Sequence, residues 1–215
     1  MKARILYLYY DIMNLYGENG NIRMMERVLK EKGAEVVIDR KTITDTKIDF
    51  TEFDFIYCGC GTELSRNACL EHLRGFASSL KTAYENGTVM LFTGNSYEML
   101  GESLTTADGV ERKGISLFDF TVKEQGTKRY SGDVTFNCTY TGDETLIGYI
   151  NKCSEVQGIK TPLFNVTSVV GTVKEGAEGL REKNFFGTQV IGPVTVKNPK
   201  FADYLADLVY KNLKI

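Results

Sequence analysis

The sequence has 215 residues, of which 42% are hydrophobic and 25% are charged, a composition typical of a folded globular protein rather than a disordered chain. Its 26 basic and 28 acidic residues leave a formal net charge of -2, without the basic surplus usual in nucleic-acid-binding proteins. No apolar run approaches the ~18 residues of a membrane-spanning helix, and the N-terminal apolar segment is too short for a signal peptide. We therefore expect one domain over residues 1–215, located in the cytoplasm, with no nucleic-acid partner and no membrane span.

The first half of the chain alternates predicted strands and helices. Residues 4–10 form an apolar run typical of a buried strand, and residues 21–32 have the apolar spacing of an amphipathic helix that ends at Gly33. Further strands are predicted at 34–38, 53–57 and 88–92. Before the last of them we expect one long helix, whose apolar stripe consists of Leu70, Leu73, Ala77, Leu80 and Tyr84. This alternation predicts an α/β fold, a three-layer α/β/α sandwich with a mostly parallel central sheet.

The second half contains short strand-like runs separated by Gly, Asp and Asn. They cover residues 115–122, 133–139, 145–150, 166–173 and 185–190, and we interpret them as mixed or antiparallel strands that extend the central sheet. A final helix is indicated by Asn198 as a cap and Pro199 at the first helical position. Its apolar face consists of Phe201, Tyr204, Leu205, Leu208 and Val209.

Three loops follow the predicted strands at the edge where open parallel sheets bind ligands. They cover residues 16–21, 58–63 and 93–98, and all are rich in Gly, Asn or Ser. Such residues also simply mark strand ends, so composition leaves both interpretations open. The turn at Gly94 has the pattern of a nucleophile elbow, in which a sharp strand-to-helix turn raises a side chain above the sheet.

Several segments match, in order, the motifs of a known family. They are Met-Asn-Leu-Tyr-Gly-Glu-Asn-Gly-Asn at 13–21, Gly-Cys-Gly at 59–61 with the following 62–66, and the elbow at 94–101. Residues 148–154 and 187–193 complete the series. The chain thereby resembles the class I (triad) glutamine amidotransferases of the cobyric-acid-synthase-like branch, most closely the glutaminase subunits of lipid II isoglutaminyl synthases. This resemblance implies the α/β/α sandwich of that family.

The departures from the family pattern concern its catalytic positions. The resemblance places the family's nucleophilic cysteine at Gly94, its catalytic histidine at Ile191 and its acid at Glu18. A thiolate must attack the glutamine amide and a histidine must carry the proton, so we expect no intact catalytic residue. Within the same motifs, Asn95 replaces a glycine, Glu98 a glutamine and Lys152 a histidine.

A candidate pocket follows from the loops and from the matched motifs. It comprises Glu18, Asn21, Gly59, Cys60, Gly61, Asn95, Ser96, Glu98, Arg129 and Asn151. Glu18, Glu63 and Glu98 either form an acidic pocket for a metal, an amine or a small cation, or are solvated loop residues or helix-start acids that face a helix dipole, which we favour. Arg129 either binds an anion or is a surface charge. The single histidine, His72, lies off the apolar stripe and is expected to be solvated.

Three functional hypotheses remain. We favour a pseudo-glutaminase that binds or regulates a partner, which the resemblance implies to be an ATP-dependent, Mur-ligase-like or cobyric-acid-synthase-like amide-forming enzyme of the cell-wall or cobyric-acid type. The alternatives are an enzyme with altered chemistry in the same pocket, around Cys60, and a glutaminase completed by its partner. The pocket would hold glutamine or another small ligand. We predict no cofactor and no metal, because Cys58-x-Cys60 is too closely spaced for a zinc pair.

Overall fold

The computed structural model describes residues 1–142 and 144–214. Its central sheet has six strands in the order β13-β14-β4-β3-β1-β2, and every neighbouring pair is parallel except β13 with β14. The strands are β1 (Lys2–Leu8), β2 (Glu35–Lys41), β3 (Phe55–Cys58), β4 (Val89–Thr93), β13 (Leu180–Glu182) and β14 (Phe185–Thr188).

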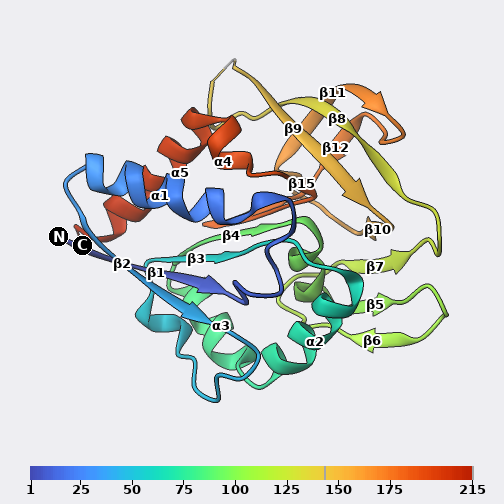
Figure 1. Ribbon diagram of the computed structural model, residues 1–215, viewed down its shortest axis with the longest axis horizontal. Coiled ribbons are helices and arrows are strands. Elements are labelled where there is room, and N and C mark those ends of the chain that lie inside the picture. Colours follow the sequence, from blue (N-terminus) through green and yellow to red (C-terminus); the bar gives the residue numbers. More distant parts are fainter. Residues whose placement is uncertain (143, 215) are drawn as a thin grey trace.

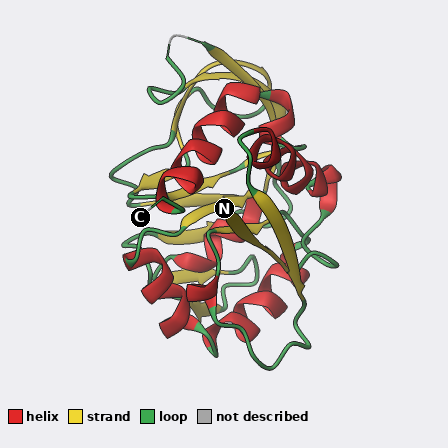
Figure 2. Cartoon of the chain, turned by 90° about the vertical axis from the view of Figure 1, so that its left-hand side faces the viewer, coloured by secondary structure: helices red, strands yellow, loops and turns green. Residues whose placement is uncertain are grey.

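Helices cover both faces of this sheet, as Figures 1 and 2 show. A hydrophobic core lies on each face of the sheet. Successive residues of a strand point to opposite faces, so Leu91 packs into one core and Phe92 into the other. The predicted α/β/α sandwich is therefore confirmed. One face carries α1 (Asn19–Glu31), α4 (Val194–Lys197) and α5 (Pro199–Asn212); the other carries α2 (Glu63–Arg74) and α3 (Ala77–Glu85).

The second half of the chain does not extend the central sheet as predicted, except through β13 and β14. Its other strands form two separate sheets, in the orders β10-β7-β5-β6 and β12-β11-β8-β9-β15. Strands such as β8 alternate buried and exposed residues, so each sheet needs only one covered face. Their bounds are β5 (Ser103–Thr105), β6 (Glu111–Lys113), β7 (Thr121–Glu124), β8 (Tyr130–Asn137), β9 (Thr145–Lys152), β10 (Ser154–Gln157), β11 (Phe164–Gly171), β12 (Gly176–Glu178) and β15 (Val190–Ile191).

Most predicted strands have somewhat different limits in the structure, and three of these differences have a clear cause in the backbone. The first ends at Leu8, because Tyr9 has a φ of +52°, which a strand does not accommodate. The strand predicted at 115–122 begins only at Thr121, since the backbone N–H groups of residues 115–117 bond to carbonyls of residues 99–101. The run at 185–190 divides at Gln189, where the chain leaves the central sheet and joins the sheet of β9 as β15.

The single long helix predicted after β3 is two helices. α2 ends at Arg74 and α3 begins at Ala77. At the junction, the N–H groups of Gly75 and Phe76 bond to carbonyls three residues back, at 3.2 and 2.9 Å. Glycine is among the weakest helix formers, and the φ of -122° at Phe76 ends the helical path. The apolar stripe nevertheless continues across the break: Leu70, Leu73, Leu80 and Tyr84 are all buried.

Two side chains have contacts that the sequence interpretation did not anticipate. The ring nitrogens of His72 lie 2.9 Å from the Tyr9 hydroxyl and 2.9 Å from the Asp45 carbonyl, so the expectation of a solvated histidine is wrong. The amide of Asn198 does not cap α5. It instead bonds to both backbone groups of Ile147, at 2.9 Å each, which ties α5 to β9.

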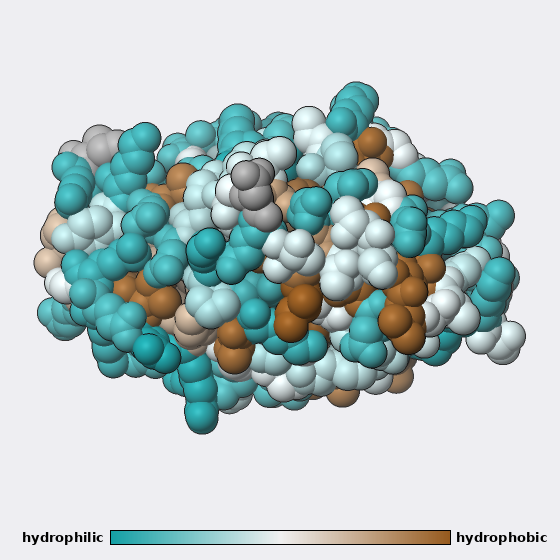
Figure 3. All heavy atoms as spheres, turned by 90° about the horizontal axis from the view of Figure 1, so that it is seen from above, coloured by the Kyte–Doolittle hydropathy of each residue, from teal (hydrophilic) through white to brown (hydrophobic). Residues whose placement is uncertain are grey.

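The surface of the molecule is mainly hydrophilic on the face shown in Figure 3, with separate hydrophobic patches. Such scattered patches are ordinary for a folded protein. Within residues 1–142 and 144–214, no helix has both the length and the apolar character needed to cross a membrane.

Candidate functional site

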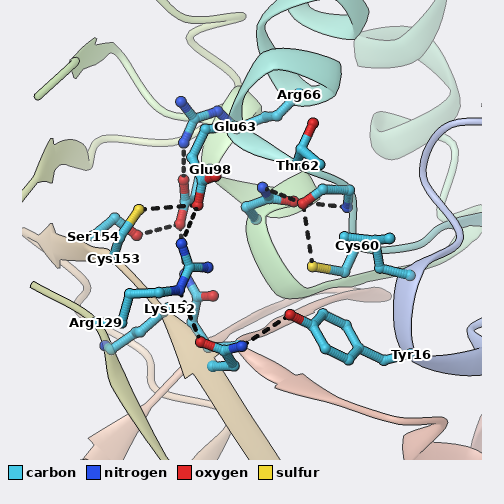
Figure 4. A pocket seen from close by; sticks show the side chains of 15 residues that line it. Tyr16, Cys60, Thr62, Glu63, Arg66, Glu98, Arg129, Lys152, Cys153 and Ser154 are labelled. Atoms are coloured by element: carbon cyan, nitrogen blue, oxygen red, sulfur yellow. Dashed lines mark hydrogen bonds and ion pairs between the residues drawn. The ribbon is translucent and has the colours of Figure 1, made fainter. Parts of the chain in front are cut away.

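The candidate site lies at the carboxyl ends of β1, β3 and β4, where the three predicted loops meet (Figures 1 and 4). A cavity of about 240 Å³ opens there. Its walls also include the end of β9, the start of β10 and Gln189. The cavity therefore lies between the central sheet and the two additional sheets, at the edge where parallel sheets bind ligands.

The elbow keeps the backbone of a sharp turn but has no space for a side chain. β4 ends at Thr93, Gly94 has a φ of +61°, and a 3₁₀ helix, η3 (Gly94–Leu100), follows. A Cβ atom built on Gly94 would lie 2.5 Å from both Cβ and Sγ of Cys60 and 3.0 Å from Cγ2 of Ile191. The space that an elbow side chain would use is thus filled by Cys60 and Ile191.

Asn95 fastens the elbow to the neighbouring glycine loop. Its Nδ2 donates to the Gly61 carbonyl at 2.8 Å, and its Oδ1 accepts from the Gly61 N–H at 3.1 Å. Asn95 itself is buried. These bonds use both backbone groups of Gly61, so its N–H is not available to a developing negative charge in the cavity.

No reactive nucleophile is present at the elbow. Burial raises the pKa of the Cys60 thiol to about 12, so the thiolate that attacks carbonyl groups is scarce at neutral pH. The buried Ser96 hydroxyl donates to the Cys58 and Thr93 carbonyls, at 2.9 and 2.8 Å, instead of facing the cavity. Among the described residues that line the cavity there is also no histidine.

Glu18 lies outside the lining of the cavity and is fully buried. It accepts hydrogen bonds from the hydroxyls of Tyr57 and Thr93 and, at 3.1 Å, from the Gly192 N–H. Burial raises the pKa of Glu18, and these hydrogen bonds only partly oppose that effect. Asn21 extends the network by donating to Tyr57 at 2.7 Å. Glu18 therefore joins the start of α1 to the chain around residue 192.

A buried ion-pair network forms the floor of the cavity. Glu98 accepts from Arg66 at 2.5 Å, from Gln189 at 2.7 Å and from the Ser154 hydroxyl. Arg66 also pairs with Glu124 of β7, and its side chain has no solvent exposure. Figure 4 shows Arg66, Glu98 and Ser154 converging in this way. Because both oxygens of Glu98 are occupied, its carboxylate is not free to bind a cation.

Arg129 lies at the mouth of the cavity, where it is held by two partners. Its Nη1 donates to Glu63 and its Nε to Asn151, at 3.0 Å each, and Asn151 in turn donates to the Tyr16 hydroxyl at 2.8 Å. Burial raises the pKa of Glu63, but hydrogen bonds from Cys153 and Arg129 outweigh it, so this pKa lies below its ordinary value. Burial and Glu63 raise the pKa of Cys153 to about 12.

The structure brings together only part of the predicted pocket. Cys60, Gly61, Asn95, Glu98, Arg129 and Asn151 line the cavity, whereas Glu18, Asn21, Gly59 and Ser96 lie outside its lining. Glu18 and Glu98 are not solvated, because both are buried. The alternative of helix-start acids agrees with Glu18 at the N-cap of α1 and with Glu63 in the first turn of α2. The three glutamates do not converge on an acidic pocket either: Glu63 and Glu98 are paired with arginines. In the described part of the chain, no group of three or more His, Cys, Asp or Glu side chains could hold a metal ion.

The sequence interpretation missed several residues of the cavity. The principal ones are Tyr16, Arg66, Lys152, Cys153, Ser154 and Gln189. Arg66 had a usable signal, since it lies four residues before Leu70, on the buried side of the same helix. A positive charge on the buried side of a helix requires acidic partners, and Arg66 has two, Glu98 and Glu124. The others lie in segments already singled out from the sequence, Tyr16 in a predicted loop and the rest in the motifs at 148–154 and 187–193, but no spacing indicated that these side chains face the cavity.

Comparisons with known proteins agree with the fold and with the resemblance. Residues 4–199 match the model of the CobB/CobQ-like glutamine amidotransferase domain. A curated relative from Staphylococcus aureus (strain N315), lipid II isoglutaminyl synthase (glutamine-hydrolyzing) subunit GatD, is 30% identical over 207 residues, which cover 96% of this chain and 84% of the relative. The subunit of the same name from Streptococcus pneumoniae (strain ATCC BAA-255 / R6) is 28% identical over 213 residues, 98% of this chain and 81% of the relative.

Solved structures show the same fold at low sequence identity. PurLQS from Thermotoga maritima superposes with a TM-score of 0.61 at 15% identity, covering 100% of this chain and 98% of that one. A structure described as a glutamine amidotransferase gives a TM-score of 0.62 at 12% identity, covering 96% of this chain and 98% of that one. The class I amidotransferase architecture expected from the sequence is therefore confirmed.

Proposed function

The chain belongs to the CobB/CobQ-like glutamine amidotransferase family, and we propose that it is a subunit of that family which has lost the glutaminase reaction. In this proposal it is a pseudo-glutaminase that binds or regulates a partner. The partner is an ATP-dependent amide-forming ligase of the cell-wall or cobyric-acid type, with a Mur-ligase-like fold as the specific expectation. The whole chain, residues 1–215, would act as one amidotransferase-like domain.

The observation that carries the proposal is the filled space at the elbow. The resemblance assigns the family nucleophile to Gly94, and a side chain there would collide with Cys60 and Ile191. Ile191, at the position assigned to the base, cannot take a proton. Loss of the nucleophile or the base lowers turnover by about 10⁶-fold in a well-studied hydrolase. The bonds between Asn95 and Gly61 support the proposal further, because they occupy an N–H that an oxyanion would need.

The two alternative functions have less support. An enzyme with altered chemistry around Cys60 would need a thiolate, which the raised pKa of this thiol disfavours. A glutaminase completed by its partner would need both a nucleophile and a base from outside, inserted where Cys60 and Ile191 are packed. The partner itself is proposed because the curated relatives are named as subunits of a lipid II isoglutaminyl synthase. The remaining cavity would take glutamine or another small ligand.

Release of glutamate from glutamine tests the loss of activity. We expect none from the purified protein, either alone or with a co-expressed Mur-ligase-like subunit from the same source. A variant that combines Cys60→Gly, Gly94→Cys, Asn95→Gly and Ile191→His should release glutamate at a measurable rate, because it vacates the blocked space, frees the Gly61 N–H and supplies both reacting groups. Release by the unmodified protein that Cys60→Ala abolishes would refute the proposal.

Association with the ligase is tested separately. The protein, isolated at native abundance from its source with a small affinity tag, should co-purify with an amide-forming ligase. Recovery of the free chain alone would contradict the proposed partner, while leaving the result of the glutamate assay unaffected.

A further inference from the structure

The central sheet ends on one side at β2, and no other described strand pairs with the outer edge of β2 (Figure 1). β2 has seven residues, whereas the other strands at sheet edges, β6, β10, β12, β13 and β15, have only two to four. Short edge strands offer a second chain little to pair with. β2 therefore differs from the other described edges in having room for a full further strand, and it contains no proline that would remove an edge donor.

The hydrogen bonds on the inner side of β2 show which of its backbone groups face outward. The Glu35 N–H donates to the Met1 carbonyl at 2.8 Å, and the Lys41 carbonyl accepts from the Tyr9 N–H at 2.6 Å. Successive residues of a strand direct their backbone groups to opposite sides. The odd-numbered residues of β2 therefore bond inward, toward β1. The N–H and C=O groups that face outward are those of Val36, Ile38 and Arg40.

The side chains of β2 are also incompletely covered. Its central apolar residues, Val36, Val37 and Ile38, are only half-buried. Glu35 and Arg40, near the two ends, are exposed, and neither has an opposite charge within 4.0 Å in the described ranges. A further strand at this edge would cover the apolar residues and leave the charged ones at the rim of the contact.

The charge pattern of β2 is complementary to itself. Opposite residues of an antiparallel pair are either both bonded to each other or both unbonded, so an outward residue must face an outward residue. A second β2 with Ile38 opposite Ile38 meets this condition and pairs all seven residues. It also places Glu35 opposite Lys41 at both ends. The two neighbouring registers of the same parity place Glu35 opposite Asp39, or Asp39 opposite Asp39, and both arrangements are repulsive.

We propose that two copies of this chain associate through β2, antiparallel about Ile38, so that their central sheets join into one continuous sheet. Each Ile38 would exchange two backbone hydrogen bonds with Ile38 of the second copy, and Val36 would do the same with Arg40. Lys41 contacts Asp45 at 3.0 Å within one chain, and its ammonium group has further donors for Glu35 of the second copy. No residue of β2 lines the candidate cavity, so this inference is independent of the proposed function.

The oligomeric state and the exchange of individual amides provide the first test. Analytical ultracentrifugation of the full chain should show a dimer at micromolar concentrations that dissociates on dilution. Amide hydrogen exchange, measured by NMR, should slow with protein concentration at the outward residues 36, 38 and 40. The inward residues 37 and 39 should not change. A chain that stays monomeric, or that gains protection at this edge only with the ligase subunit present, would overturn the inference.

Arg40→Pro tests the backbone contacts. It removes an outward N–H without loss of a bond to β1 or of a buried side chain, since Arg40 is exposed. The dimer should be at least about ten-fold weaker, because the contact occurs twice. Lys113→Pro is the matched control on β6: the N–H of Gly114 donates to the Glu102 carbonyl, so Lys113 faces away from β5. The control should dimerise like the unmodified protein, and a dimer unaffected by Arg40→Pro would overturn the inference.

Two charge reversals test the register, and they remain informative if Arg40→Pro does not fold. Glu35→Lys places lysine opposite Lys41, and Lys41→Glu places glutamate opposite Glu35, so each variant alone should dimerise more weakly by about five-fold or more. An equimolar mixture of the two variants should form heterodimers, visible by native mass spectrometry, because both facing pairs then have opposite charges. Homodimers of undiminished strength, or a mixture without preferred heterodimers, would overturn the inference.

Discussion

At the scale of single residues, the defining feature is that two loops compete for one space. Gly94 can adopt its φ of +61° because it has no side chain, and the thiol of Cys60 lies where that side chain would begin. A side chain at position 94 needs the space that the Cys60 side chain occupies, so the two positions cannot both carry a side chain of this size. Cys60 and Gly94 therefore form a coupled pair, and placing a side chain at the elbow requires a change at Cys60 as well.

Gly94→Cys alone should destabilise the fold. Overpacking costs about 1–3 kcal/mol in a dense core, in addition to the strain of a positive φ. Gly109→Cys is a matched control, since Gly109 has a φ of +84° but a Cβ at that position would have no other atom within 4 Å. Urea unfolding should show Gly94→Cys to be about 1–3 kcal/mol less stable than the control. Adding Cys60→Gly should recover most of this difference, and equal stability of the two single variants would contradict the coupling.

The thiol of Cys60 should be slow to alkylate in the folded protein. Because its pKa is raised to about 12 by burial, the thiolate fraction rises tenfold per pH unit across the neutral and mildly alkaline range. Iodoacetamide labelling followed by peptide mass spectrometry should therefore show a rate at Cys60 that still increases at about pH 10. In urea, the same residue should level off above about pH 8.5. Levelling off at that pH in the folded state would show a reactive thiol.

At the scale of elements, the break between α2 and α3 contains a glycine, Gly75, that lowers helix propensity but is not required by its backbone conformation or by packing. Gly75 keeps a helical φ of -64°, and a Cβ there would meet its nearest atom, the His72 carbonyl oxygen, at 3.4 Å. The glycine is therefore compatible with a side chain, although it weakens the helix. Gly33, which follows α1, has a φ of +87° and does require glycine.

Gly75→Ala should stabilise the protein by about 0.4–1 kcal/mol, because it restricts the unfolded chain without strain in the folded one. Gly33→Ala should instead destabilise it by about 1 kcal/mol or more. Thermal and urea unfolding of both variants provides the comparison. A loss of stability in Gly75→Ala would mean that the turn between the helices needs glycine for a reason other than propensity.

The sequence predicted those elements whose own pattern is strong. Four parallel strands and the helical regions between them were predicted, although as one helix where α2 and α3 are separate, because they combine continuous apolar runs with helical spacing. β5 and β6 were not, since each has only three residues and depends on its neighbours. The separation into three sheets could not be predicted from the strand sequences, because the alternation of buried and exposed residues is the same whichever sheet a strand belongs to.

At the scale of the whole molecule, two buried carboxylates lie where separate parts of the chain meet. Glu18 joins the start of α1 to residue 192, and Glu178 joins β12 to residues 188 and 189. Burial raises the pKa of both above the ordinary value of 4.5. The folded state therefore keeps these protons to a higher pH than the unfolded state does.

The sign of the resulting pH dependence follows from proton binding. Above pH 4.5 the unfolded state is already ionised, so the free energy of unfolding falls as pH rises through the raised pKa of Glu18. As pH rises above 4.5 toward the raised pKa, the unmodified protein should lose stability relative to Glu18→Gln, as measured by urea unfolding.

Glu63 provides a comparison, because its pKa is shifted in the opposite direction and its effect on stability therefore has the opposite pH dependence. Its pKa is lowered, so its contribution is present above pH 4.5 and lost as pH falls below that value. Glu63→Gln should therefore remove a stabilisation that is already constant between about pH 5 and about pH 8. A stability difference from Glu18→Gln that is equally constant over this range would show that Glu18 is ionised throughout.

The sequence alone determined the α/β core, the sheet edge where the cavity opens, and the glycine and isoleucine at positions 94 and 191, to which the resemblance assigns the family's cysteine and histidine. These follow from local patterns and from the identity of single residues. Only the tertiary structure decided that Cys60 fills the elbow, that Asn95 closes the glycine loop and that Arg66 pairs with Glu98 and Glu124. Each of these contacts joins segments distant in sequence, whose mutual positions are set by packing in three dimensions rather than by local spacing.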